Sequence, residues 1–141
     1  MSVRRPRAET IDVKRLMREA EAARPRAHAP YSRFRVGAAL LTRGGRIITA
    51  CNVENASLGL SMCAERAAVF RAIAEGERDF RAIAVTAGRG QTAPPCGACR
   101  QVLAEFAPAL VVYWSDRGGR TVRRRLAQLL PDGFTLGGGG S

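Results

Sequence analysis

The order of apolar segments along the chain constrains its fold more than any other feature. A segment with helical spacing comes first, and two runs rich in Ala, Val, Ile and Leu follow at residues 36–41 and 46–53, separated by a turn at Gly44 and Gly45. Three more strand-like runs, at 81–86, 110–114 and 121–122, then alternate with helical segments. This α-β-β-α-β-α-β-β-α order predicts an α/β, three-layer architecture, in which a mixed five-stranded sheet carries helices on both faces.

Four helices are expected from periodicity and from the residues that start and stop helices. The first is expected to begin at a Thr10 cap and to end at Pro25. The second, residues 62–74, is apolar on nearly every side, which is typical of a buried helix. The third runs through residues 96–106, and the last lies near residues 123–130.

Length and composition exclude several classes of protein. The chain has 141 residues, of which 46% are hydrophobic and 25% charged, so it is not disordered throughout. No apolar run reaches 18 residues, which excludes a membrane span, and the basic N-terminus lacks the apolar core of a secretory signal. We therefore expect a cytoplasmic protein with free thiols. Residues 1–8 are expected to form a mobile basic arm, 9–136 one domain, and 137–141 a flexible Gly/Ser tail that resembles an added linker.

The chain is strongly basic, which raises the question of an anionic partner. It carries 23 basic and 12 acidic residues, a net charge of +11, and all but one of the basic residues are arginine. Nucleic-acid binding is not otherwise supported, because aromatic residues make up only 6% of the chain and form no RNA-binding signature. The run 123–125, three arginines, is interpreted as a solvated helix start or a subunit contact.

Two cysteines lie three residues apart at the start of the third helix. Cys96 and Cys99 therefore share one helix face, and the positive end of the helix dipole favours their thiolate forms. A C-x-x-C pair is either a redox couple or half of a zinc site. A thioredoxin-like redox pair is disfavoured because the motif lies late in the chain, after a hairpin.

Cys63 stands at the start of the buried helix, just before Glu65 and Arg66. Two charges within an apolar helix call for an explanation, since burial without compensation costs several kcal/mol. Either both side chains lie on an exposed first turn, or a metal lies nearby. Three thiolates leave one position of a tetrahedral zinc open to water, and Glu65 would lie beside that metal as a proton shuttle. Arg66 would offset the excess negative charge by hydrogen bonding to a thiolate.

Cys51 is a fourth thiol, in an expected strand. If it were a fourth ligand, the site would be closed to water; otherwise it is a buried neutral thiol.

Four motifs in order, with a C-terminal element, resemble the small homotetrameric cytidine deaminases. The matching stretches are residues 31–40, 52–57, 63–66, 95–102 and 129–134. The resemblance spans about residues 10–136 and implies a cytidine deaminase-like fold. It implies hydrolysis of free cytidine and 2′-deoxycytidine to uridine and 2′-deoxyuridine, with release of ammonia, in pyrimidine salvage.

The same resemblance implies a role for each motif residue. Cys63, Cys96 and Cys99 would bind one Zn²⁺ per chain, and Glu65 would move protons between the zinc-activated water, the pyrimidine and the departing ammonia. The backbone near Ala64 would contact the pyrimidine edge, Phe34 would line the base pocket, and Asn52 and Glu54 would hold the ribose 3′-hydroxyl. Phe134 would close the pocket of a neighbouring subunit in a homotetramer.

The chain departs from the family pattern at two positions, and three other functions are alternatives to a nucleoside deaminase. Leu58 stands where relatives often have Tyr, and His28 where an aromatic residue is common. A deaminase acting on a polynucleotide would suit the basic charge, but a carboxylate at Glu54 would repel a 3′-phosphate. A blasticidin-S type of deaminase is disfavoured by Asn52, Glu54 and Phe34. A purely structural zinc domain would have no use for Glu65.

Overall fold

The computed structural model describes residues 10–136 and confirms the α/β, three-layer architecture predicted from the sequence. The five strands are β1 (Gly37–Thr42), β2 (Ile47–Cys51), β3 (Phe80–Thr86), β4 (Val111–Ser115) and β5 (Thr121–Arg125). They form one sheet in the order β2-β1-β3-β4-β5, in which β3 and β4 are parallel and the other neighbours antiparallel. The arm expected at residues 1–8 and the tail expected at 137–141 lie outside the described residues.

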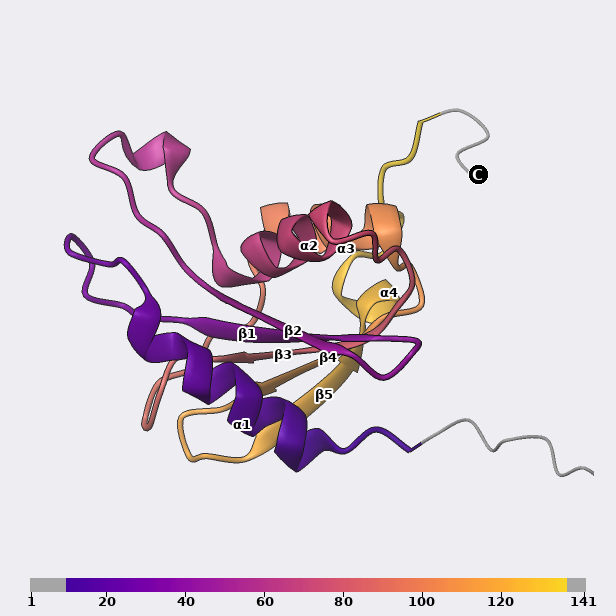
Figure 1. Cartoon of the computed structure of the whole chain (residues 1–141), viewed down its shortest axis with the longest axis horizontal. Helices are drawn as coiled ribbons and strands as arrows, with labels where there is room; N and C mark the ends of the chain where they lie inside the picture. Colours follow the sequence, from indigo (N-terminus) through magenta and orange to yellow (C-terminus); the bar gives the residue numbers. More distant parts are fainter. Residues whose placement is uncertain (1–9, 137–141) are drawn as a thin grey trace, which may run out of the picture.

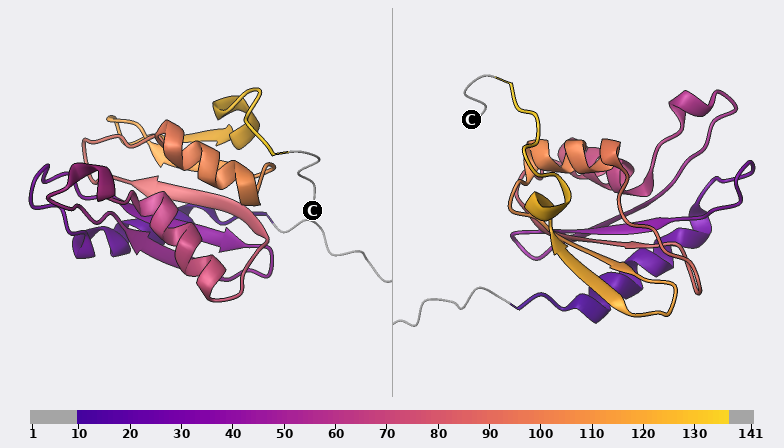
Figure 2. Two further views of the ribbon diagram at one scale, coloured as in Figure 1. Left: turned by 90° about the horizontal axis from the view of Figure 1, so that it is seen from above. Right: turned by 180° about the vertical axis from the view of Figure 1, so that it is seen from behind.

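Helices cover both faces of this sheet, as Figures 1 and 2 show. One face packs against α1, and the other against α2, α3 and the short α4. The helices are α1 (Val13–Ala23), α2 (Ala64–Ala74), α3 (Gly97–Phe106) and α4 (Leu126–Leu129), and two 3₁₀ turns, η1 (Arg24–Arg26) and η2 (Leu58–Leu60), lie in the loops. Within residues 10–136, no helix is both long and apolar enough to cross a bilayer.

Strand β1 illustrates why this sequence forms a buried central strand. Successive side chains of a strand point to opposite faces. Ala38 and Leu40 join the core beneath α2 and α3, whereas Ala39 and Leu41 join the core beneath α1. Small and aliphatic residues at every position therefore satisfy both faces at once, as expected for a strand covered on both sides.

A close backbone approach fixes α1 against β1. A Cβ added at Gly37 would lie only 2.0 Å from the Ala20 carbonyl oxygen and 2.8 Å from the Arg24 nitrogen. These neighbours are backbone atoms, which cannot rotate out of the way. Glycine at this position therefore lets the end of the helix pack directly on the strand.

Two local expectations from the sequence are wrong. The cap of α1 is Asp12 rather than Thr10, because the Asp12 side chain accepts a hydrogen bond from the Arg15 amide at 3.1 Å. The run 123–125 is not a helix start: it belongs to β5, where it pairs with β4. Pairing at the edge of a sheet satisfies the backbone of this run and leaves its charged side chains exposed to water.

Candidate functional site

The N-termini of α2 and α3 bring three thiols together. Cys63 occupies the N-cap position of α2, Cys96 that of α3, and Cys99 lies in the first turn of α3. Their three sulfur atoms all lie within 4.8 Å of one another. The Sγ atoms of Cys63 and Cys96 are 3.9 Å apart, and those of Cys96 and Cys99 are 3.4 Å apart.

This geometry fits a tetrahedral zinc centre. A Zn–S bond of about 2.3 Å places two sulfur ligands of a tetrahedron about 3.8 Å apart. The measured separations of 3.9 and 3.4 Å lie on either side of that value. The cluster could therefore hold a metal ion with three thiolate ligands and a fourth position free.

Arg66 supplies the positive charge that a cluster of thiolates requires. Its Nη2 atom donates to the Cys63 sulfur at 3.4 Å. Hydrogen bonds from Cys99 and then from Arg66 lower the pKa of the Cys63 thiol to about 5. The Arg66 Nε atom is buried and has no hydrogen-bond partner among the described residues. An unpaired buried donor beside three sulfurs fits a site whose ligands become negatively charged when a metal binds.

Glu65 is the only buried charged residue within residues 10–136. Its exposed fraction is only 5%, which makes the alternative of an exposed first turn wrong. Burial raises the pKa of its carboxyl group to about 7. The side chain lines a pocket of about 290 Å³ together with Cys63 and Cys96. A carboxyl group in this position is suited to exchanging protons with a molecule bound beside the thiols.

The pocket gathers most of the residues that the sequence assigned to a site. It is lined by Phe34, Val36, Asn52, Cys63, Ala64, Glu65, Thr92, Ala93, Pro94 and Cys96. Cys99 is fully buried and is not among the lining residues. Sequence reasoning missed the wall at 92–94, whose only signal is that it directly precedes the C-x-x-C motif. It also missed Val36, because a valine in a strand-like run indicates only a core residue.

Asn52 joins the pocket to the loop that precedes β1. Its Oδ1 atom accepts a hydrogen bond from the Val36 amide at 2.8 Å, and its Nδ2 atom donates to the Phe34 carbonyl at 2.8 Å. The two bonds hold the backbone on both sides of residue 35. Asn52 therefore positions Phe34 at the pocket wall while its own side chain also faces the pocket.

Glu54 does not line this pocket. Its Oε1 atom accepts hydrogen bonds from the amides of Tyr31, at 3.0 Å, and Ser32, at 3.1 Å, and its Oε2 atom accepts one from the Ser32 hydroxyl. The Ser32 hydroxyl, followed by the two amides, lowers the pKa of this carboxyl group. In this structure Glu54 thus holds the 31–32 turn, adjacent to the residues that line the pocket.

The remaining residues singled out in the sequence lie away from the cluster. Phe134 is 69% exposed and lines a separate hollow near α4, and its carbonyl accepts a hydrogen bond from Gln101 at 2.9 Å. Cys51 ends β2 and is not part of the thiol cluster, so the four-thiolate site is not formed. Leu58 is exposed in η2, and the His28 backbone bridges to Val53.

Comparisons with known proteins agree with this geometry. Residues 10–115 match the family model described as the cytidine and deoxycytidylate deaminase zinc-binding region. A cytidine deaminase of Halalkalibacterium halodurans is 51% identical over 126 residues, 89% of this chain and 96% of that protein. One of Sporosarcina psychrophila is 44% identical over 126 residues, 89% of this chain and 93% of that protein. The crystal structure of the Burkholderia pseudomallei cytidine deaminase is 47% identical and superposes with a TM-score of 0.83, over 88% of this chain and all of that one.

Proposed function

Since the chain belongs to the zinc-binding cytidine and deoxycytidylate deaminase family, we propose that it hydrolyses free cytidine and 2′-deoxycytidine to the corresponding uridines and ammonia. One observation carries this proposal: two thiols of a three-thiol cluster and one buried carboxyl group line a single pocket of about 290 Å³. The pocket lies near the lower end of the size range typical of small-molecule sites.

Cys63, Cys96 and Cys99 are the proposed zinc ligands. Zinc with three protein ligands supplies a Lewis acid that makes a water molecule acidic near neutral pH. Arg66 balances the charge of the ligands through its hydrogen bond to Cys63. The resulting need for an electrostatic partner explains why Arg66 stands in the first turn of α2.

Glu65 is the proposed proton carrier. Its carboxylate accepts a proton from the water that attacks C4 of the pyrimidine, and passes that proton to N3. A C–O bond forms at C4, the C4–N4 bond then breaks, and Glu65 returns the second water proton to the leaving amine. The balance is cytidine plus water giving uridine plus ammonia. The buried position of Glu65 limits the contact of its carboxyl group with bulk water during these transfers.

Phe34, Asn52 and the backbone of Ala64 are proposed to bind the base and the ribose from the pocket wall. Glu54 is proposed to accept a hydrogen bond from the ribose 3′-hydroxyl, for which it would exchange part of its bonding to Ser32. A negative charge at that position disfavours a 3′-phosphate, so free nucleosides are favoured over nucleic acid. The net charge of +11 alone would favour a polyanion, and the negative charge of Glu54 opposes that preference beside the pocket.

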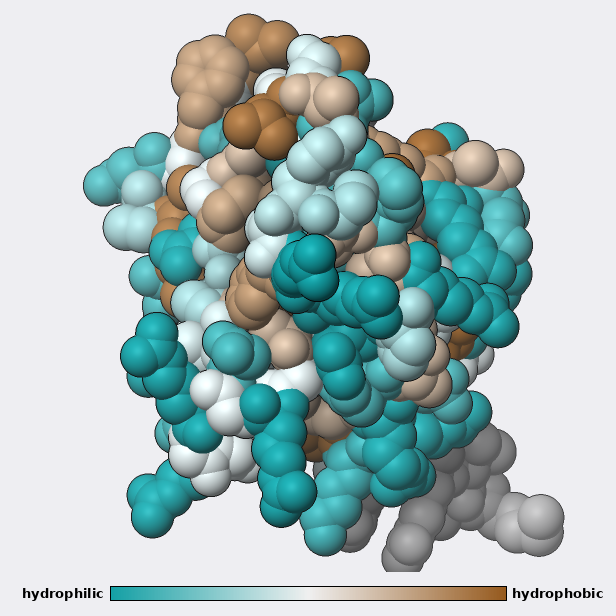
Figure 3. All heavy atoms as spheres, turned by 90° about the vertical axis from the view of Figure 1, so that its left-hand side faces the viewer, coloured by the Kyte–Doolittle hydropathy of each residue, from teal (hydrophilic) through white to brown (hydrophobic). Residues whose placement is uncertain are grey.

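We further propose a cytoplasmic homotetramer active in pyrimidine salvage, in which one domain spans residues 9–136. Leu58, Leu60 and Phe134 are each about 70% exposed, which is unusual for large apolar side chains. Figure 3 shows apolar side chains gathered along the top of the face nearest η2, above a mainly hydrophilic lower part. In the proposed tetramer these side chains are buried between subunits, and Phe134 closes the pocket of a neighbouring subunit. Light scattering that finds a monomer at micromolar concentration would contradict this arrangement.

Ultraviolet absorbance with purified, zinc-loaded protein tests the reaction directly. The expected result is conversion of cytidine and 2′-deoxycytidine to uridines, with much slower turnover of cytosine in single-stranded DNA and of blasticidin S. Comparable rates on cytidine and single-stranded DNA would contradict the role given to Glu54. A zinc-loaded protein that converts none of these substrates would instead support a structural zinc domain.

A further inference from the structure

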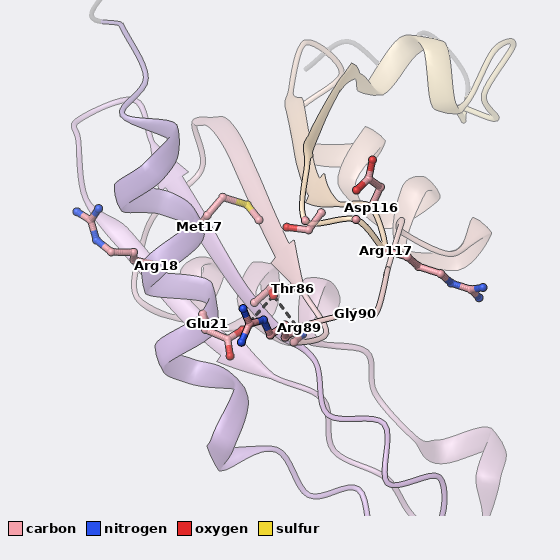
Figure 4. A pocket seen from close by; sticks show the side chains of 12 residues that line it. Met17, Arg18, Glu21, Thr86, Arg89, Gly90, Asp116 and Arg117 are labelled. Carbon is pink, nitrogen blue, oxygen red and sulfur yellow. Dashed lines mark hydrogen bonds between the residues drawn. The ribbon is translucent and has the colours of Figure 1, made fainter.

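A second hollow, of about 550 Å³, lies between α1 and the loops that follow β3 and β4. Figure 4 shows Met17 extending from α1 toward this space, with Thr86 and Arg89 near the end of β3. The hollow shares no lining residue with the pocket at the thiol cluster, and nothing in the proposed reaction uses it. Its volume is within the range of small-molecule sites.

The hollow lies where a parallel pair of strands ends. β3 and β4 are the only parallel neighbours in the sheet that the structure describes, and their last residues, Thr86 and Ser115, both line it. In α/β sheets, ligands bind outside the carboxyl ends of parallel strands, because the loops there leave a crevice. The position is therefore one at which this class of fold accommodates small molecules.

Three exposed arginines line the hollow without ion pairs. Arg18 comes from α1, Arg89 from the loop after β3, and Arg117 from the loop after β4. None of the three forms a salt bridge within residues 10–136. In Figure 4, the guanidinium group of Arg89 lies beside Thr86, whereas the side chains of Arg18 and Arg117 point away from the hollow on opposite sides. Exposed arginine side chains can turn toward a bound anion, and guanidinium groups bind phosphate through charge-assisted hydrogen bonds.

The two carboxylates that line the same hollow already have partners. Glu21 pairs with Arg24 at 2.7 Å and accepts a hydrogen bond from the Thr86 hydroxyl at 3.0 Å. Asp116 accepts a hydrogen bond from the Arg120 amide at 2.8 Å. Because Arg24 balances Glu21, the three lining arginines outnumber the remaining carboxylate and leave the hollow positive.

The hollow is connected to the catalytic pocket through one loop. Gly88 packs so closely on Arg24 that an added Cβ would lie 2.9 Å from the guanidinium carbon. The chain continues from Arg89 and Gly90, which line the hollow, to Thr92 and Pro94, which line the catalytic pocket. A ligand bound to Arg89 would therefore contact the loop that continues, three residues later, into the pocket wall.

We propose that this hollow binds a small phosphate monoester. Arg89 binds the phosphate group, the side chains of Arg18 and Arg117 turn inward to join it, and Met17 contacts the organic part of the ligand. The thioether of methionine adapts to varied apolar surfaces, which suits this second role. Free inorganic phosphate shares the anionic chemistry but lacks the part that Met17 would contact, so its binding is weaker.

Isothermal titration calorimetry on the zinc-loaded full chain tests the proposal with three probes. Adenosine 5′-monophosphate is expected to bind saturably, inorganic phosphate more weakly, and adenosine not at all. Arg89→Gln and Arg117→Gln should each weaken binding of the monophosphate on the order of tenfold, because each removes a charge-assisted hydrogen bond. The matched control is the double variant Arg123→Gln, Arg124→Gln, which removes two positive charges from β5 outside the hollow and should retain affinity.

Several outcomes overturn the proposal. Equal binding of adenosine and its monophosphate would exclude phosphate recognition, and equal weakening by the control pair would indicate only a general charge effect. Absence of saturable binding by the monophosphate would show that the hollow is not such a site. Arg89 and Arg117 lie outside the catalytic pocket, so both variants should deaminate cytidine like the parent protein. Turnover therefore tests the proposed function separately.

Discussion

The N-termini of three helices in this protein are built in different ways. α1 begins with Asp12, whose side chain accepts a hydrogen bond from the Arg15 amide. α2 and α3 begin with Cys63 and Cys96, and neither side chain makes a capping hydrogen bond. The helix that only covers the sheet thus has a local cap, whereas the two helices at the thiol cluster do not.

This difference shows what the site requires of the fold. An N-cap side chain satisfies the free amides of the first turn and stabilises a helix by about 1 kcal/mol. At α2 and α3 this position is occupied by sulfur atoms that face one another instead. A metal bound between them would tie the two helices together, so the stabilisation lost from each cap would be recovered only in the metal-bound protein. Substitution of the α1 cap should therefore lower stability alone, whereas substitution at the cluster should lower zinc content and turnover.

The largest effect is expected from Cys99→Ser. Loss of one proposed ligand should remove stoichiometric zinc and lower cytidine turnover by more than about 100-fold. A loss of about 100-fold is the upper limit usually found when a residue that only hydrogen-bonds to a metal ligand is replaced. Atomic absorption and ultraviolet assays measure the two quantities. Cys51→Ser is the matched control and should retain both, because Cys51 lies outside the cluster. A Cys99→Ser variant with one zinc per chain and full activity would remove Cys99 from the site.

Asn52→Ala should have the next largest effect. The change removes the hydrogen bonds to Val36 and Phe34 and one polar group from the pocket. Each bond contributes about 1 kcal/mol, so KM for cytidine should rise on the order of tenfold or more, with a smaller change in kcat. Steady-state kinetics distinguish the two parameters. Unchanged kcat and KM would mean that Asn52 neither binds substrate nor positions Phe34.

Part of this comparison could be read from the sequence and part could not. The grouping of the three cysteines and Glu65 could be predicted because the residue types proposed as metal ligands and proton carrier recur at short, recognisable spacings. The wall at 92–94 leaves no such signature, since its residues are small or apolar. The bonding of Glu54 to Ser32 joins residues 22 positions apart, which local patterns do not reveal. The sequence did not predict the full length of β5. Its arginines were assigned to a helix, but pairing with β4, which local patterns do not show, makes them part of a strand.

Asp12→Ala tests the other side of the comparison. Loss of the cap should lower the free energy of unfolding by about 1 kcal/mol, within a range of about 0.5–2. Zinc content and turnover should not change, because α1 lies on the opposite face of the sheet from the cluster. Urea denaturation measures the first quantity, with Asp12→Asn as a control that keeps a capping group. A loss of zinc in Asp12→Ala would show that the two regions are coupled.

The smallest effect concerns Glu21 at the other end of α1. Hydrogen bonding to Arg24 lowers the pKa of this carboxyl group, so the unfolded chain takes up its proton first as the pH falls. Its contribution is fully present above about pH 4.5 and is lost as the pH falls through the lower folded value. Glu21→Gln should therefore cost less than about 1 kcal/mol at pH 7, with the difference from the parent protein shrinking below pH 4.5. A difference that grows in acid would contradict the assigned ion pair.

Glu65→Ala provides the most direct test of the account, because Glu65 is the residue that separates a catalytic zinc site from a structural one. Cytidine turnover and bound zinc should be measured on the same preparations of parent and variant. We expect one zinc per chain in both, and a turnover lower by roughly 10²–10⁴-fold in the variant. Equal turnover in the two proteins, or zinc absent from the variant, would contradict the proposed role of Glu65 as proton carrier.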